Sequence, residues 1–473
     1  MPILSPRNCI AAAMLIHACT AGAQQSAVPE DARPQDARVF TLDPSTLPFN
    51  AVSDTQAETD RWWGLLGGSG YRVEVPRNWN GSLVMWAHGY AGDSPQLEAD
   101  EPPFRRYLIE HGYAWASSSF SRNNYDVRAG IEDTNALALA FTAIAAQNNR
   151  PLPAPSRLYI AGGSMGGHVA AAAVETETLA TARNPVRYDG ALPLCGAVAD
   201  TELFDYLAAY QLATQYFGGK AAAAFPATDF QQLRPELRDA LWYIYPAAPK
   251  EQGRQLKNAV MNLTGGARPL FELSFKLRPY QDAVWNRFGT DGTLDGILAF
   301  NVADTTRIVY QEDNDPALSA DEALHNSGIV RAVASPEANR PRRDGLRWVP
   351  KVNGQFSVPV LTMHTLGDLY VPFSMEQSYR RRAIANGNDA LLVQRAIRSP
   401  GHCEFTVAEE AAAFEALVNW VQTGAKPAGD DVLTPTAVAD GNYGCTFTND
   451  ATGPDDNRGL SAIRKLVPGC PGR

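Results

Sequence analysis

Residues 158–168 read LYIAGGSMGGH, a strand pattern that runs straight into a glycine-rich turn. Its apolar start predicts a buried strand, and the Ala-rich stretch from Gly167 to Leu179 predicts a helix. Between them lies Gly-x-Ser-x-Gly, in which small residues let backbone segments pass close to Ser164. The N-terminus of the following helix supplies positive potential for a developing oxyanion. This context predicts that Ser164 is a nucleophile, and a Gly-rich loop is the alternative.

Strand and helix patterns alternate on both sides of this turn. The strand patterns are residues 71–75, 82–87, 114–117, 191–194, 358–363 and 391–393, and further helix patterns are residues 104–110, 131–146 and 407–421. The strand at 71–75 alternates apolar and polar residues, which predicts one exposed face, whereas 82–87 is largely apolar. The alternation predicts an α/β fold with a mostly parallel sheet flanked by helices.

The alternation stops in a stretch that is helix-like and rich in aromatic residues. The simplest organisation is one sheet interrupted by a helical cap, inserted before the strand at 358–363. We expect an N-terminal arm at 24–54, core halves at 55–200 and 351–424, the cap at 201–350 and a tail at 425–473. A separate second domain is the alternative, but it would leave the first half of the sheet incomplete.

The first 23 residues have the layout of a secretory signal peptide. Arg7 precedes an apolar run, and Ala21-Gly22-Ala23 is a small-residue cleavage site, so we expect the mature chain to begin at Gln24. An ordinary N-terminal helix or a lipid anchor at Cys19 is the alternative. No later stretch reaches the roughly 18 uninterrupted apolar residues of a membrane helix. We therefore expect a secreted or periplasmic protein without membrane insertion.

Charge and cysteine spacing exclude several partners and cofactors. The formal net charge of −10 disfavours nucleic acid and anionic membranes. The basic clusters at 340–343 and 380–382 are expected to be solvated faces. No cysteine pair has the spacing of metal ligands, and no Cys-x-x-Cys occurs, so the sequence predicts neither a metal nor a redox cofactor.

A serine nucleophile needs a base, and the base needs an acid that orients it. His402, within residues 399–403 (SPGHC), lies on a loop after the last strand pattern and just before the final helix. Asp368, within residues 365–368 (TLGD), follows the strand pattern that ends at Met363. Ser164, Asp368 and His402 therefore follow three different strands, and we predict that they form the catalytic set.

Four cysteines follow the predicted cleavage site: Cys195, Cys403, Cys445 and Cys470. An even number in an oxidising compartment predicts two disulfides. Cys195 ends the strand at 191–194 and Cys403 follows His402, so both lie at the carboxyl edge of the sheet, where active-site loops converge. We therefore favour the pairs Cys195–Cys403 and Cys445–Cys470. Free thiols at Cys195 and Cys403 are the alternative.

The quoted residues resemble the α/β-hydrolase superfamily from about Trp62 to Gly424, apart from the cap. The resemblance implies that His88-Gly89-Tyr90 is an oxyanion-hole loop, with the backbone N–H groups of Tyr90 and Met165 holding the oxyanion. His402 and Cys403 are similar to a pair in the tannase and feruloyl-esterase group, which has a cysteine where this chain has Gly163. The Gly-Gly-Ser-x-Gly-Gly form is also similar to prolyl-oligopeptidase-like and prolyl aminopeptidase sequences.

Together these features predict acyl transfer to water through an acyl-enzyme on Ser164, without a cofactor. The resemblance implies a small-molecule carboxylic ester as substrate, because relatives with a large helical cap serve esters, and amide or peptide bonds are the alternative. A non-catalytic binding module is a remote alternative. The cap aromatics between Phe204 and Trp285 are expected either to form a pocket above Ser164 or simply to pack the cap.

Overall fold

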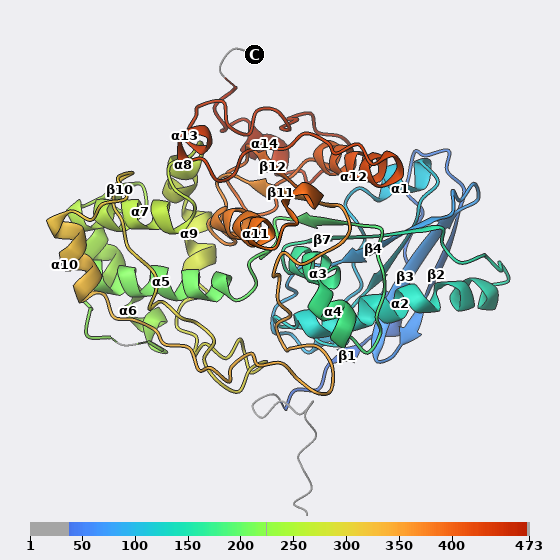
Figure 1. The fold of residues 1–473 in the computed structure, drawn as a ribbon, viewed down its shortest axis with the longest axis horizontal. Helices are drawn as coiled ribbons and strands as arrows, with labels where there is room; N and C mark the ends of the chain where they lie inside the picture. Colours follow the sequence, from blue (N-terminus) through green and yellow to red (C-terminus); the bar gives the residue numbers. More distant parts are fainter. Residues whose placement is uncertain (1–36, 224, 471–473) are drawn as a thin grey trace, which may run out of the picture. The chain divides into compact units, whose positions relative to one another are not determined.

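A sheet of eight strands forms the centre of the protein (Figure 1), in the order β12-β11-β8-β7-β4-β6-β3-β2. Six neighbouring strands are parallel: β4 (Ser82–Ala87), β6 (Ala114–Ser118), β7 (Arg157–Gly163), β8 (Gly190–Leu194), β11 (Val360–Thr365) and β12 (Leu392–Ile397). The pairs β6–β3 (Ser69–Pro76) and β3–β2 (Thr59–Leu66) are antiparallel. The computed structural model describes residues 37–223 and 225–470, so the predicted signal peptide lies outside it. The predicted α/β fold with a mostly parallel sheet is confirmed.

Helices cover both faces of the sheet because alternate residues of its strands are apolar on both sides. In β4, Leu83 and Met85 pack in one core and Val84 and Trp86 in another. The first core includes residues of α2 (Val127–Gln147), α3 (Met165–Ala173) and α11 (Ser374–Ala385), and the second includes α1 (Arg105–Glu110) and α12 (Val407–Thr423). Among the described residues, no helix is long and apolar enough to cross a membrane.

The strand at residues 71–75 departs from its expected half-exposed pattern, and a strand that the sequence analysis missed lies beside it. β3 is buried over nearly its whole length. Its Glu74 is fully buried, where it pairs with Arg105 at 2.6 Å and accepts from Trp115 Nε1 at 2.9 Å. The missed strand β2 is a partly exposed edge strand with mixed polarity, which gives little periodic signal.

The single helix predicted at 167–179 is wrong, because α3 ends at Ala173 and α4 (Thr176–Thr181) follows. Glu175 lies between them. Its buried carboxylate accepts from the backbone N–H groups of Gly354 at 2.8 Å and Gln355 at 2.9 Å, which belong to the chain returning to the sheet. The break between the two helices therefore allows Glu175 to bind a distant part of the chain. Burial raises the pKa of Glu175 to about 7.

The raised pKa of Glu175 gives the stability of the protein a defined pH dependence. Because the folded pKa of about 7 exceeds the ordinary 4.5, the folded state binds this proton more tightly than the unfolded chain does. Its contribution therefore makes the free energy of unfolding fall as pH rises through this window. Glu175→Gln cannot ionise at this position. Between pH about 4.5 and about 7 we therefore expect the free energy of unfolding of the wild type to fall by about 2–3 kcal/mol relative to that of this variant. Urea unfolding of both proteins measures the difference, and parallel pH curves would contradict the prediction.

The segment between β8 and β11 contains helices, a short hairpin and long stretches of irregular chain. Its elements are α5 (Glu202–Phe217), α6 (Phe230–Leu241), β9 (Trp242–Ile244), β10 (Ala248–Pro249), α7 (Glu251–Leu263), α8 (Phe271–Lys276), α9 (Arg278–Trp285) and α10 (Ala320–Gly328). Several aromatic residues pack on one another inside it, such as Trp285, whose ring centroid is 5.7 Å from those of Trp242 and Phe230. We refer to residues 201–350 as the cap.

The two ends of the cap meet at one buried ion-pair cluster. Asp200 is fully buried, and its carboxylate contacts Lys351 Nζ at 2.7 Å and Arg382 Nη1 at 2.6 Å. Burial alone raises the pKa of Asp200, but the charges of Lys351 and Arg382 outweigh burial and lower the pKa to about 2. The expectation of solvated basic faces is therefore wrong for Arg382, and also for Arg342, which pairs with Asp344 at 2.9 Å and is only 8% exposed.

The chain after α12 lies on the core rather than apart from it. It contains α13 (Pro435–Val438) and α14 (Leu460–Arg464). Val438 and Tyr443 pack with Leu366 of the core, and Arg464 pairs with the buried Glu409 of α12 at 2.6 Å. A Cys445–Cys470 disulfide closes this segment. At the other end of the described chain, β1 (Thr41–Leu42) pairs with β5 (Gln96–Leu97).

Candidate active site

Ser164 occupies a strained turn between β7 and α3. Its φ of 58° and ψ of −120° are unusual for a residue with a side chain, and such strain is of order 1–3 kcal/mol. The turn is held by bonds from Ser164 N–H to Leu194 O (2.9 Å) and from Gly167 N–H to Ser164 O (2.9 Å). A Cβ on Gly166 would lie 1.9 Å from Ala87 O. Glycine is therefore required where α3 crosses the end of β4.

The structure brings Ser164, Asp368 and His402 together at the carboxyl edge of the sheet. The distance between His402 Nε2 and Ser164 Oγ is 2.7 Å, and that between His402 Nδ1 and Asp368 Oδ2 is 2.5 Å. Asp368 is fully buried, whereas the side chain of His402 is 22% exposed. The other carboxylate oxygen of Asp368 accepts from the N–H groups of Tyr370 (2.8 Å) and Val371 (3.0 Å). The backbone therefore fixes the orientation of the carboxylate toward the imidazole.

A disulfide ties the loop that carries His402 to the neighbouring strand. Cys195 follows β8 and bonds to Cys403, with their Cα atoms 5.3 Å apart. The N–H of Cys195 also donates to Met363 O of β11 at 2.8 Å. Among the described residues, Cys195, Cys403 and His402 form the one group with ligand atoms close enough for a metal ion, but both sulfurs are consumed by the disulfide.

Further contacts from the cap hold the same loop, and sequence reasoning missed them. Glu404 accepts from Gly401 N–H at 2.7 Å and from the hydroxyl of Tyr280 in α9 at 2.7 Å. Ser274 of α8 donates to Pro400 O at 2.7 Å. These cap residues are more than 120 positions away from the loop. No local pattern in the sequence could have indicated them.

A second buried histidine lies behind Asp368. His364 Nε2 donates to Val371 O at 2.8 Å and lies 3.7 Å from Asp368 Oδ2, while its Nδ1 is 3.4 Å from Glu376 Oε1. Burial lowers the pKa of His364, but the nearby carboxyl of Glu376 and the charge of Asp368 outweigh burial and raise that pKa. His364 therefore supports the segment whose N–H groups bind Asp368.

The loop at residues 88–90 passes beside Ser164. A Cβ on Gly89 would lie 3.3 Å from the Cβ of Ser164. The ring of His88 is buried and stacks on Phe120 with centroids 3.9 Å apart, so its side chain belongs to the core. Among the hydrogen bonds of the described residues, none is donated by the backbone N–H of Tyr90 or of Met165. Met165 directly follows Ser164 in the chain, and Tyr90 directly follows Gly89.

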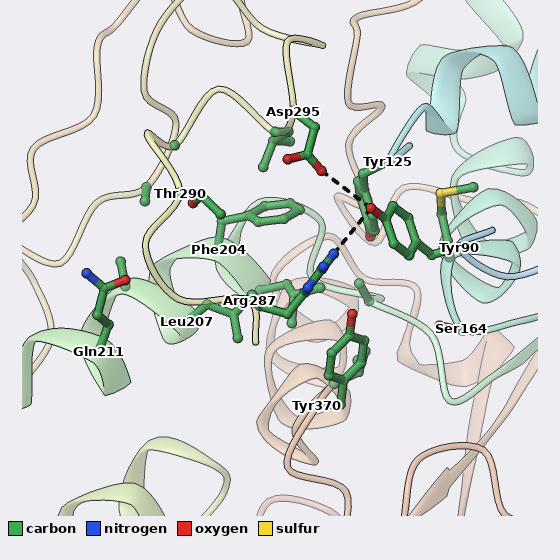
Figure 2. Close-up of a pocket in the computed structure, with 18 of the residues that line it drawn as sticks. Tyr90, Tyr125, Ser164, Phe204, Leu207, Gln211, Arg287, Thr290, Asp295 and Tyr370 are labelled. Carbon is green, nitrogen blue, oxygen red and sulfur yellow. Dashed lines mark hydrogen bonds between the residues drawn. The ribbon is translucent and has the colours of Figure 1, made fainter. Parts of the chain in front are cut away.

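A pocket opens above Ser164, between the cap and the edge of the sheet (Figure 2). Most of its lining is apolar or aromatic: Tyr90, Tyr125, Met165, Ala197, Leu203, Phe204, Leu207, Ala208, Phe225, Leu294, Ala303, Tyr370 and Val371. Its few polar side chains include Gln211, Arg287 and Asp295. A separate hollow, which Tyr370 also lines, includes Tyr280, Ala283 and His402 in its wall. Some aromatic residues of the cap, such as Phe204 and Phe225, therefore line the pocket, whereas others, such as Trp285, pack inside the cap.

The comparisons with known proteins give one curated relative and several similar structures. The o-phthalyl amidase of Xanthobacter agilis is 24% identical over 444 residues, which cover 82% of this chain and 93% of that protein. Feruloyl esterase B from Aspergillus oryzae is 15% identical, with a TM-score of 0.43 over 80% of this chain and 85% of that chain. An esterase from Aspergillus oryzae is 12% identical, with a TM-score of 0.41 over 76% of this chain and 78% of that chain. No protein-family model matches the sequence.

The fold and the order of the site residues resemble a known arrangement. The mostly parallel sheet has helices on both faces, and a serine stands on a strained turn between a central strand and a helix. An acid and then a histidine follow this serine in chain order and meet it in space, as in the α/β-hydrolase arrangement. The protein therefore has the α/β architecture, with a mostly parallel sheet between helices, that the sequence predicted.

Proposed function

We propose that the protein is a serine hydrolase that cleaves small carboxylic esters through an acyl-enzyme on Ser164. The observation that carries the proposal is the unbroken hydrogen-bonded series from Ser164 through His402 to the buried Asp368, at the floor of an apolar pocket. This arrangement activates a serine hydroxyl, because the histidine can take its proton while the acid holds the imidazole in the required tautomer.

In the proposed reaction, Ser164 Oγ attacks the substrate carbonyl carbon as its proton moves to His402 Nε2. The N–H groups of Tyr90 and Met165 stabilise the negative oxygen of the tetrahedral intermediate. His402 then gives the proton to the departing group, so that group lies on the histidine side, where Tyr280 and Ala283 line the second hollow. The acyl part occupies the main pocket. Water, deprotonated by His402, finally releases the acid and restores Ser164.

Amide cleavage is the second candidate, and the curated relative favours it because that protein is an o-phthalyl amidase. The same machinery cleaves both bonds, but an amine is a poorer leaving group and needs its proton earlier. A panel of esters and amides with identical acyl groups separates the two candidates by kcat/KM. The two disulfides support our further proposal that the protein works in an oxidising compartment, either secreted or periplasmic.

The proposed function predicts that a fluorophosphonate probe labels the wild-type protein once, at Ser164. We expect Ser164→Ala to abolish labelling, because the probe reacts with an activated serine that has a base and an oxyanion hole. Ser327→Ala, which alters an exposed serine of the cap, is the matched control and should label as the wild type does. Intact-mass spectrometry and peptide mapping measure both results. A folded wild type that is not labelled would instead indicate a binding module.

A further inference from the structure

Arg287 is a positive charge in the wall of the proposed substrate pocket. It follows α9 and is half-buried, and its Nη1 donates to the hydroxyl of Tyr90 at 3.2 Å (Figure 2). Its Cζ lies 5.4 Å from the centroid of the Tyr90 ring, and Tyr370 is a second phenol in contact with it. Among the described residues, no carboxylate lies within ion-pair distance of this guanidinium.

Other arginines with little exposure in this protein either pair with acids or, like Arg268 and Arg398, donate to two or more backbone carbonyls. Arg105 pairs with Glu74 at 2.6 Å and Arg464 pairs with Glu409 at 2.6 Å. A guanidinium that is partly removed from water costs free energy unless an anion faces it, so two neutral phenols are incomplete compensation. Arg287 therefore stands out as a charge whose natural partner is a ligand in the pocket.

The acid that lines the pocket, Asp295, does not lie within ion-pair distance of Arg287. Burial lowers the pKa of Arg287, but the neighbouring phenols and, to a lesser extent, the charge of Asp295 outweigh burial and raise that pKa. Asp295 is exposed, and its carboxylate accepts a bond of 3.4 Å from the Tyr90 hydroxyl rather than one from Arg287. Figure 2 shows Arg287 and Asp295 directed at the Tyr90 hydroxyl from different sides. Tyr90 thus receives a bond from the arginine and gives one to the aspartate, and the guanidinium keeps further N–H groups for an anion.

The surroundings of Arg287 place that anion on the acyl part of the substrate. Tyr370, in contact with Arg287, lies with its ring centroid 5.4 Å from that of His402, and Tyr90 lies in the loop beside Ser164. Arg287 lines the same pocket as Ser164 and not the hollow on the histidine side. Most of the pocket wall is apolar or aromatic, which suits a planar hydrocarbon body.

We propose that Arg287 binds a carboxylate on the acyl part of the substrate, which makes half-esters or half-amides of aromatic dicarboxylic acids the preferred class. The inference rests on the hydrolase function proposed above and adds the acyl group to it. Arginine suits the role because its planar fork can donate two parallel hydrogen bonds to a carboxylate. Neutral diesters lack this anion and gain only the contacts with the apolar wall.

The test compares monoethyl and diethyl esters of the benzene dicarboxylic acids on wild-type protein and Arg287→Gln. A charge-assisted bidentate contact predicts that Arg287→Gln lowers kcat/KM about 10- to 100-fold for the best half-ester, but less than about threefold for its diester. Arg287→Lys keeps the charge but cannot donate two parallel hydrogen bonds. We expect its kcat/KM for the half-ester to lie between those of the wild type and Arg287→Gln. Arg381→Gln, on the exposed Arg381 of α11, is the matched control and should change neither rate.

Equal losses on both esters would overturn the inference, because Arg287 would then support the site in general. A wild type that prefers the diesters would overturn it as well. A measurement on the wild type alone tests the inference even if the Arg287 variants do not fold. We expect a benzene dicarboxylate to inhibit diester hydrolysis at a concentration at least tenfold lower than benzoate does. Equal inhibition by the two compounds would overturn the proposal. Absence of all turnover and of Ser164 labelling would instead contradict the hydrolase function itself.

Discussion

Asp368→Asn is expected to lower kcat about 10⁴-fold while the protein stays folded. One carboxylate oxygen of Asp368 already accepts two backbone N–H bonds, from Tyr370 and Val371. In the variant, the amide oxygen of the asparagine must accept these two N–H bonds. The NH₂ group of the asparagine therefore faces His402 Nδ1. A donor at this position forces the imidazole proton onto Nε2. The histidine can then no longer accept the proton of Ser164 Oγ, and the nucleophile is not activated.

The measurement is kcat on the best substrate from the ester and amide panel, together with thermal unfolding of each protein. Asp315→Asn is the matched control, because Asp315 is an exposed aspartate of the cap that accepts only a local bond from Ala317 N–H. This control should stay within about twofold of the wild type, as expected of a surface change away from the site. Near-normal activity of Asp368→Asn would mean that another carboxylate orients His402.

Gly166→Ala is expected to prevent folding, although it adds a single methyl group. The new Cβ would lie 1.9 Å from Ala87 O and 2.6 Å from Ala87 C. Both atoms belong to β4, which pairs with β6 on one side and β7 on the other, so neither can move away without breaking the centre of the sheet. Overpacking of this severity exceeds the usual cost of about 1–3 kcal/mol. It therefore threatens a total stability of about 5–15 kcal/mol.

Gly163→Ala is the matched control from the same turn. A Cβ on Gly163 would meet only the ring of Trp86, at 3.8 Å, which is an ordinary contact. We expect this variant to fold and to keep activity within a few-fold of the wild type. The yield of folded protein and its thermal unfolding decide between the two substitutions. A folded, active Gly166→Ala protein would show that the turn can open without loss of the sheet.

The elements that could be predicted from the sequence are those whose signal is local. The strand before Ser164, the glycines around it and the helix after it adjoin one another in the chain, so residue type alone indicated their structure. Asp368 and His402 could also be singled out, because each follows an apolar strand pattern. Their meeting in space then follows from the parallel sheet, which gathers the carboxyl ends of its strands on one edge.

The features that the sequence analysis missed depend on partners far away in the chain. The helix break at Glu175 exists for the backbone of Gly354 and Gln355, and the burial of Glu74 depends on Arg105 and Trp115. Local periodicity carries no information about such partners. For the same reason the contacts of Ser274 and Tyr280 with the histidine loop could not be foreseen, nor could the position of Arg287 in the pocket.

The meeting of the two cap ends at Asp200 and Lys351 has a consequence for how such a protein can change over generations. The insertion leaves and re-enters between β8 and β11, which are neighbours in the sheet, so its ends stay together whatever lies between them. Under the proposed function, deletions, insertions or exchanges within the cap can alter which acyl group is selected while Ser164, Asp368 and His402 keep their places. Natural variation in the cap can therefore change substrate selectivity with little effect on the residues that would cleave the bond. The contacts of α8 and α9 with the histidine loop are the part of the cap that such variation must keep.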